Sequence, residues 1–320
     1  ERNHLSRKMI QDNYRLFCQV KVRENMDIEI PKEFFGIKKW ECTVVSNHNV
    51  ATFIKELVLQ LPDNQTIDFH SGSYVQLDIP VYDTSFHQFQ IEHPYHQEWE
   101  KMHIFDLNTR NSSPTVRAYS MANHPAENVI IMLNVRIATP PFDKINGKWK
   151  KISPGLASSY IFSLKPGDKV TVSGPYGEFN VEDSEREMMF IGGGAGMAPM
   201  RSHIFHQFKT LHTQRKTSFW YGGRSLKELF YMDEFQNLEK EHPNFSFHVV
   251  LSEPNNEDQW NGLTGFVHQA IFENYLKNHP YPEDIEYYIC GPPMMLQAVL
   301  KMLDSLGVDA SMIHYDDFGG

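Results

Sequence analysis

An apolar run that ends in a cluster of glycines constrains the fold of this chain more than any other stretch. Residues Met188–Phe205 read MMFIGGGAGMAPMRSHIF, a short apolar segment followed by four glycines and a helical pattern. A strand, a glycine turn and a helix together present backbone N–H groups and a helix N-terminus to a phosphate. Glycine permits the unusual backbone angles of such a turn and lets a pyrophosphate approach the main chain. The stretch predicts a nucleotide-binding turn in a parallel sheet, although a tight turn without a ligand would have the same pattern.

Length and charge narrow the class of protein. A chain of 320 residues, 41% of them hydrophobic, is long enough for two buried cores. A formal charge of −10 argues against nucleic acid as a partner. No run of apolar residues is long enough to span a bilayer, and no signal peptide begins the chain, so we expect a soluble chain. Three scattered cysteines, Cys18, Cys42 and Cys290, predict no disulfide framework and fit a reducing cytoplasmic setting.

The pattern of apolar residues divides the chain into three parts. Residues 1–40 contain two short strand patterns, too few to bury a core alone. Residues 41–183 are rich in short strands bounded by Gly, Pro and Asn, which predicts an antiparallel β-barrel with a long polar and aromatic insertion at 81–114. Residues 184–320 alternate strands with helices, which predicts a doubly wound parallel sheet that binds ligands at the carboxyl ends of its strands.

An arginine, a tyrosine and a serine share one strand of the predicted barrel. In the segment VRAYSMAN, Arg117 and Tyr119 lie on one face by the two-residue period of a strand, with Ser120 on the opposite face or at the bend of the strand. A guanidinium can pair with a diphosphate, a phenol can stack on a flavin ring, and a hydroxyl can bond the ring edge. A surface arginine beside a half-buried barrel tyrosine explains the same residues equally well.

A second small-residue helix start follows later in the barrel. The segment GLASSY, Gly155–Tyr160, predicts a helix N-terminus that can bind an anion, although an ordinary serine-capped helix would also have this sequence. Two phosphate-binding patterns in one chain suggest two nucleotides.

A rigid turn closes a late strand of the parallel sheet. The segment CGPPM begins at Cys290, which we expect near an arriving nicotinamide at the carboxyl end of that strand. No activating group for a nucleophilic thiol is visible in the sequence.

The four motifs, in this order on a barrel followed by an α/β sheet, resemble the ferredoxin–NADP⁺ reductase superfamily. The match tightens with the segments RLFCQVKV and RAYSMAN and the ending IHYDDFG, which resemble the F subunits of sodium-translocating NADH:quinone oxidoreductases over nearly the whole chain. The resemblance implies an oxidoreductase in which NADH passes a hydride to FAD. Electrons would then go singly to a [2Fe–2S] centre and onward to quinone, while sodium is pumped.

The resemblance also assigns roles to residues. Arg117 would bind the FAD diphosphate, Tyr119 would stack on the isoalloxazine, and Ser120 would bond near its N5–O4 edge. Phe318 would cover the other flavin face, or else be a core residue of the last strand. Phosphate and ribityl contacts would come from Gly155, Ala157, Ser158 and Ser159. The NADH site would be bordered by Gly193, Gly194, Ala195, Gly196, Met197, Pro199, Cys290, Gly291 and Pro292. Ser120, Cys290 and Phe318 would be the catalytic residues.

Only the resemblance suggests a role for residues 1–40. Family members carry a transmembrane helix and a plant-type [2Fe–2S] domain, whose clusters need three closely spaced cysteines and a distant fourth. Cys18 matches the fourth ligand, so we expect residues 1–40 to be a remnant of that domain without a cluster. The full-length protein would lie on the cytoplasmic side of the inner membrane, with other subunits of the complex as partners.

The same sequence allows three alternatives to this function. A soluble NAD(P)H-dependent reductase for a ferredoxin or an oxygenase is one, and a flavin-binding module without turnover is another. Arg224 follows a sheet strand where the 2′-phosphate of NADPH could be bound, whereas the resemblance implies NADH.

The pairs His203/His206 and His93/His96 have a spacing that can bind metal, but a polar helix face explains them better.

Overall fold

The computed structural model describes residues 21, 23, 37–143 and 147–318. Residues 1–36 form a unit separate from residues 37–320. Cys18 and the two predicted N-terminal strands lie outside the described residues, so the remnant of a [2Fe–2S] domain stays a prediction.

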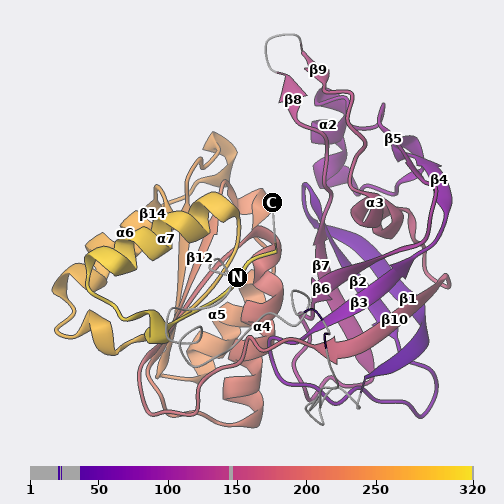
Figure 1. The fold of residues 1–320 in the computed structure, drawn as a ribbon. Coiled ribbons are helices and arrows are strands. Elements are labelled where there is room, and N and C mark those ends of the chain that lie inside the picture. The colour runs from indigo at the N-terminus through magenta and orange to yellow at the C-terminus, as the bar shows by residue number, and fades with distance from the viewer. Residues whose placement is uncertain (1–20, 22, 24–36, 144–146, 319–320) are drawn as a thin grey trace. The chain divides into compact units, whose positions relative to one another are not determined.

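The first half of the described chain is an antiparallel sheet. Its strands pair in the order β6-β3-β10-β1-β2-β7 (Figure 1). Their bounds are β1 Lys38–Ala51, β2 Ile54–Gln60, β3 Tyr74–Ile79, β6 Thr115–Ser120, β7 Ile130–Arg136 and β10 Lys169–Tyr176. A bridge between Met121 and Leu133 joins the ends of the two edge strands, so the sheet closes on itself. Alternate residues such as Val75 and Leu77 on β3 are fully buried in the core, as period-two strands require.

The insertion at 81–114 is folded and has its own core. It contains β4 (Tyr82–Ser85), η3 (Phe86–Gln88), α2 (His93–Lys101) and β5 (Asn108–Asn111). Trp99 and Phe86 are fully buried there and pack with Phe162 of α3 (Leu156–Ser163). The small hairpin of β8 (Phe142–Asp143) and β9 (Lys148–Trp149) lies beside the insertion through a bond from Trp149 Nε1 to the Met102 carbonyl, 3.0 Å.

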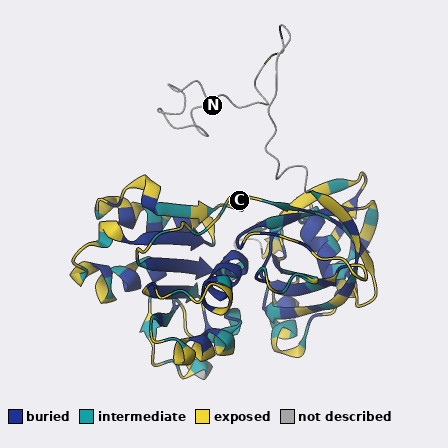
Figure 2. Cartoon of the chain, turned by 90° about the horizontal axis from the view of Figure 1, so that it is seen from below, coloured by how far each residue is buried: buried dark blue, intermediate teal, exposed yellow. Residues whose placement is uncertain are grey.

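The second half is a parallel sheet, as predicted. Its strands pair in the order β14-β13-β12-β11-β15-β16, all parallel. Their bounds are β11 Met188–Gly193, β12 Thr217–Gly223, β13 Phe245–Leu251, β14 Leu263–Thr264, β15 Glu286–Cys290 and β16 Ile313–Asp316. The central strands β11 and β15 are buried along their whole length (Figure 2). Strand β11 is accordingly apolar throughout, whereas β15 begins with Glu286, whose carboxylate is paired with Arg215.

Helices cover both faces of this sheet (Figure 1). Helices α4 (Met197–Phe205) and α5 (Met232–Glu241) pack on the face of Phe190 and Phe219, and α6 (Val267–Asn274) and α7 (Pro293–Ser305) on the face of Ile191 and Trp220. A π-helical turn, η5 (His206–Thr210), extends α4. Short turns fill the connections: η4 (Gly194–Gly196), η6 (Leu226–Glu228), η7 (Asn256–Asp258), η8 (Leu276–Asn278), η9 (Pro282–Asp284) and η10 (Ala310–Met312). The sequence did not predict α5, whose ten residues bury only Phe235 and Leu238.

Helix α4 lies between the sheet and the barrel, so the expectation of a polar face at His203 was wrong. His203 is fully buried, its Nδ1 lies 3.1 Å from Ser71 Oγ, and burial lowers its pKa to about 3. Arg201 on the same helix is 5% exposed and donates to the Ala122 carbonyl and to Glu127 and Glu234 over 2.9 to 3.1 Å. The residues that the structure describes contain no group of His, Cys, Asp or Glu that could hold a metal ion.

Candidate functional site

A cleft of about 680 Å³ lies where the antiparallel sheet meets the carboxyl ends of the parallel strands. We call it the barrel-side cleft. Strand β6 contributes Arg117, Ala118, Tyr119 and Ser120, and β7 contributes Asn134 and Arg136. The other wall consists of the glycine turn after β11, the Gly291–Pro293 turn and the C-terminal segment Asp316–Phe318.

Arg117, Tyr119 and Ser120 of the segment RAYSMAN all line this cleft. Arg117 is exposed and uses one nitrogen, Nη1, to donate to Thr115 Oγ1 (3.0 Å) and the Val116 carbonyl (2.8 Å). Burial raises the pKa of the Tyr119 phenol, and the nearby Arg117 only partly opposes this, so the phenol stays neutral. The cleft thus offers a cation, a neutral aromatic ring and a hydroxyl, the set that a flavin with a diphosphate requires.

Ser120 and the last strand are joined across the cleft. The Ser120 hydroxyl donates to Asp316 Oδ2 over 3.0 Å. Burial raises the pKa of the Asp316 carboxyl, Ser120 lowers it, and Asp317 raises it further, so the net direction is upward. Phe318 is 48% exposed and lines the same cleft, which is unlike a core residue.

Cys290 lies directly behind the cleft wall. Its thiol is fully buried, and burial, with Asp316 and Asp317 adding to it, raises its pKa well above the usual value. The sulfur is therefore a neutral thiol at physiological pH, and Gly291 and Pro292, not Cys290, line the cleft. An unactivated thiol agrees with the absence of activating groups in the sequence.

Close approach explains the glycines of the turn. A Cβ on Gly196 would lie 2.2 Å from the Cys290 carbonyl oxygen, so only glycine lets α4 start this close to β15. Gly194 has φ +54°, and a Cβ there would meet nothing nearer than Ile54 Cδ1 at 3.9 Å. A side chain at Gly194 would fill space in the cleft that the backbone now leaves to a ligand.

Two groups of predicted ligand contacts lie outside this lining. Ser158 Oγ accepts from Ala138 N (3.1 Å), and Ser159 Oγ bonds Thr109 Oγ1 (3.1 Å). Gly155 donates its N–H to the Ala138 carbonyl over 2.8 Å, which holds the start of α3 beside the cleft residue Ala138. The roles of these residues and of the buried Ala157 stay predictions, as do those of Met197 and Pro199, which are buried in the α4 packing.

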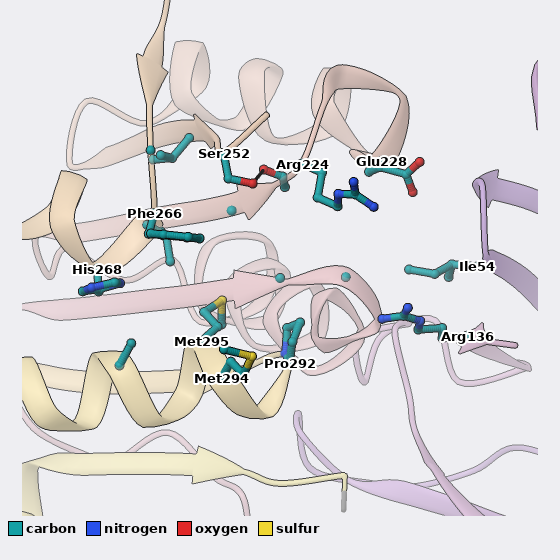
Figure 3. Close-up of a pocket in the computed structure, with 18 of the residues that line it drawn as sticks. Ile54, Arg136, Arg224, Glu228, Ser252, Phe266, His268, Pro292, Met294 and Met295 are labelled. Carbon is teal, nitrogen blue, oxygen red and sulfur yellow. Dashed lines mark hydrogen bonds between the residues drawn. The ribbon is translucent and has the colours of Figure 1, made fainter. Parts of the chain in front are cut away.

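A second cleft, of about 430 Å³, follows the carboxyl ends of β11, β12 and β13 (Figure 3). We call it the sheet-end cleft. Apolar side chains from three segments border it, among them Phe266, Met294 and Met295, and Phe266 and Met294 are 62% and 84% exposed. Arg224 and Glu228 also line it. The two clefts share Arg136, Gly193, Gly194 and Pro292, so they adjoin.

Arg136 is a candidate that the sequence analysis missed. It ends the apolar strand β7 and lies at the junction of both clefts, and its guanidinium has no hydrogen bond or ion pair within the described part of the chain. A charged residue ending an apolar strand was the available signal.

The barrel offers a cation, an aromatic ring and a hydroxyl to a flavin, and the parallel sheet has an adjoining cleft. This combination defines a class, the FAD- and NAD-binding oxidoreductases. Family models agree: an oxidoreductase FAD-binding domain matches residues 81–181, and an oxidoreductase NAD-binding domain matches residues 190–301. This chain belongs to the family of the F subunits of Na(+)-translocating NADH-quinone reductases. The F subunit of Methylococcus capsulatus is 56% identical over all 320 residues, which cover 78% of its length, and that of Actinobacillus succinogenes is 54% identical with 77% covered.

Solved structures show the same fold. The chain is similar to a cytochrome P450 reductase of Amycolatopsis, with a TM-score of 0.65, 25% identity, and 88% of this chain and 70% of that chain covered. It is also similar to the FAD/NAD-binding domain of a nitric oxide dioxygenase of Vibrio cholerae, with a TM-score of 0.64, 22% identity, and 88% and 99% covered.

Proposed function

We propose that this chain oxidises NADH through FAD as the flavoprotein part of a sodium-translocating NADH:quinone oxidoreductase. The observation that carries the proposal is the junction of the two clefts at Arg136, Gly193, Gly194 and Pro292. A dinucleotide held along the sheet ends and a flavin held against β6 would meet there. We further propose that the other subunits of such a complex are its partners and that it acts at the membrane with them. Among the described residues, no helix is long and apolar enough to cross a bilayer.

The residues of the barrel-side cleft fit FAD. Arg117 would bind the diphosphate, and Tyr119 and Phe318 would contact the ring system from β6 and from the C-terminal segment. When bound, a flavin supplies the exchange between two-electron chemistry at a nicotinamide and one-electron transfer to an acceptor. Gly155, Ala157, Ser158 and Ser159 would support the phosphate side, and Gly193 to Met197 with Pro199, Cys290, Gly291 and Pro292 would border the nicotinamide.

This chain's own residues orient the ligands and control the proton environment. Ser120 is fixed by its bond to Asp316, so its oxygen has a defined place at the cleft edge. Burial, with the charge of Asp317 adding to it, raises the pKa of the Asp316 carboxyl beside that edge, although the hydrogen bond from Ser120 lowers it. Cys290 stays a thiol behind the cleft wall, where it packs under Gly291 and Pro292 and is not activated as a nucleophile.

The proposal is tested by anaerobic stopped-flow mixing of the flavin-loaded protein with NADH and, separately, with NADPH. We expect rapid bleaching of the flavin absorbance with NADH. Bleaching mainly by NADPH would favour a soluble reductase that passes electrons to another acceptor, such as a ferredoxin or an oxygenase. A bound flavin that neither nucleotide reduces would identify a binding module without turnover.

A binding variant tests the flavin site separately. Arg117→Ala removes a charge-assisted phosphate contact worth about 1.5–3 kcal/mol, so we expect purified protein with little bound FAD. Arg110→Ala, an exposed arginine of β5, is the matched control. An Arg117→Ala protein with full yellow colour would contradict the assignment.

A further inference from the structure

Carboxylates outnumber the cation at the outer part of the sheet-end cleft, around Arg224. Arg224 donates through Nε and Nη2 to Glu253 Oε2, over 3.3 and 2.7 Å. The bond and charge of Glu253, with the charges of Glu228 and Glu98, raise the pKa of this guanidinium. Arg224 is therefore paired with Glu253 and also lies in the field of two further carboxylates, although it lines the cleft.

The pair of Arg224 and Glu253 is held by the backbone. Glu253 N donates to the Arg224 carbonyl over 2.8 Å, and Ser252 N donates to the Gly223 carbonyl over 2.9 Å. These two bonds tie the loops that follow β12 and β13. The carboxylate consequently stays beside the guanidinium even though both side chains are exposed to solvent.

Glu228 is the carboxylate of this group that lines the cleft itself (Figure 3). Its Oε1 accepts a short hydrogen bond from Thr52 Oγ1, which belongs to the turn between β1 and β2. Thr52 is 1% exposed, so this bond is shielded from water. The barrel therefore positions the Glu228 carboxylate, while the backbone of Glu228 is held in η6 by a hydrogen bond from its N–H to the Ser225 carbonyl, 3.1 Å.

The insertion in turn fixes Thr52. Trp99 of α2 is fully buried and donates its Nε1–H to the Thr52 carbonyl over 2.7 Å. Tyr95 also belongs to α2, and the Nζ of Lys227, the residue before Glu228, lies 5.5 Å from the centre of its ring. A continuous set of contacts thus leads from α2 through Thr52 to a carboxylate in the nucleotide cleft.

We infer that Glu228, positioned by Thr52 and Trp99, makes the sheet-end cleft selective for a dinucleotide whose adenosine ribose bears a free 2′-hydroxyl. A carboxylate accepts a hydrogen bond from a ribose hydroxyl but repels a phosphate, which carries about −1.5 to −2 charges at neutral pH. Of the two arginines that line the cleft, Arg224 is already paired with Glu253, and Arg136 lies at the junction with the barrel-side cleft. The inserted segment 81–114 therefore acts as the support of the selectivity site. This inference rests on the proposed function, since it takes the sheet-end cleft as the NADH site.

The experiment compares two fragments that differ in the 2′-phosphate, 5′-AMP and 2′,5′-ADP. Their binding to the flavin-loaded protein is measured by titration calorimetry, which needs no turnover. For the wild-type chain we expect 5′-AMP to bind and 2′,5′-ADP to bind much more weakly. Glu228→Gln should shift the ratio of the two dissociation constants toward 2′,5′-ADP by about tenfold or more, and Thr52→Val should shift it in the same direction by a smaller factor. The ratio of kcat/KM for NADPH and NADH should move in parallel.

Matched variants separate selectivity from general damage. Thr84→Val makes the same change in the insertion, where the hydroxyl bonds Gln88 Oε1 at 3.2 Å, and Glu241→Gln removes one negative charge from the exposed end of α5. Neither should change the ratio. Thr52→Ser keeps the hydroxyl and should restore the wild-type ratio, which a merely structural role of this site would not require.

The outcomes are distinct. An unchanged ratio in Glu228→Gln, or an equal loss of both fragments, would overturn the inference and leave the proposed function standing. A wild-type chain that binds neither fragment would overturn the proposed function as well.

Discussion

A lysine buried between the barrel and its insertion gives the most quantitative prediction. Lys55 on β2 is 1% exposed, and its Nζ donates to the Gln90 carbonyl over 2.7 Å and to the Asn47 carbonyl over 3.3 Å. The ammonium also lies 5.5 Å from the centre of the Phe162 ring. Burial lowers its pKa from 10.5 to about 8, and the charge of Glu92 only partly opposes this.

The lowered pKa of Lys55 determines the direction in which the free energy of unfolding changes with pH. The unfolded chain keeps the lysine proton up to about pH 10.5, whereas the folded chain releases it near pH 8, so the unfolded state binds more protons between these values. The free energy of unfolding must therefore rise with pH in this window. At about 1.36 kcal/mol per pKa unit, the full cost of burying the charge is about 3 kcal/mol below pH 8, and about 2 kcal/mol of it is relieved between pH 8 and pH 10.

The variant Lys55→Met isolates this contribution. It removes the titrating group but leaves two carbonyls unpaired, at about 1–3 kcal/mol each, so its net effect near pH 7 is small or unfavourable. The discriminating quantity is the pH dependence. Urea unfolding, followed by the fluorescence of the tryptophans that include Trp99, should show wild type gaining about 2 kcal/mol over Lys55→Met from pH 8 to pH 10. Lys38→Met, at an exposed position of β1, should run parallel to wild type. Parallel curves for wild type and Lys55→Met would refute the reasoning.

Three further changes test other contacts. Arg201→Met leaves the carboxylates of Glu127 and Glu234 without their buried cation, so unfolding should become easier by about 3–5 kcal/mol in urea titrations; a loss below about 1 kcal/mol would show that the pairs contribute little. Gly196→Ala forces a methyl group to within 2.2 Å of a backbone oxygen, and we expect a lower melting temperature and less bound flavin, whereas an intact flavin content would contradict the close packing. Phe318→Ala should alter the stopped-flow kinetics with NADH more than the flavin content; unaltered NADH kinetics would reject its role at the nicotinamide.

The order of strands and helices was predictable because burial leaves a strong signal in the sequence. The run that became β11 is apolar throughout, since both faces of a central parallel strand are covered, and Gly196 marks the place where α4 approaches β15. The Arg117 to Ser120 segment alone fits a surface arginine beside a half-buried barrel tyrosine equally well, and only its place among four ordered motifs indicated a flavin site.

Other parts of the site depend on contacts between distant segments, which a local pattern does not encode. His203 looked like part of a polar face, because nothing in the sequence of α4 reveals that a barrel loop covers it. Nothing in the sequence distinguishes Glu228 from a surface acid, and its carboxylate accepts a hydrogen bond from the hydroxyl of Thr52, 176 residues away in the chain. Lys55 shares a face of β2 with the buried Leu57 and Leu59, but nothing in its own strand reveals that the Gln90 carbonyl of the insertion accepts a hydrogen bond from its ammonium.

The junction shared by the two clefts has a practical consequence for the flavin-free protein. If a flavin lies against β6, as proposed, its removal opens the sheet-end cleft at Gly193 and Gly194, which both clefts share. Nucleotide affinities measured on flavin-depleted material therefore describe a differently shaped receptor. An inhibitor selected against such material would be optimised for a wall that the working enzyme does not have.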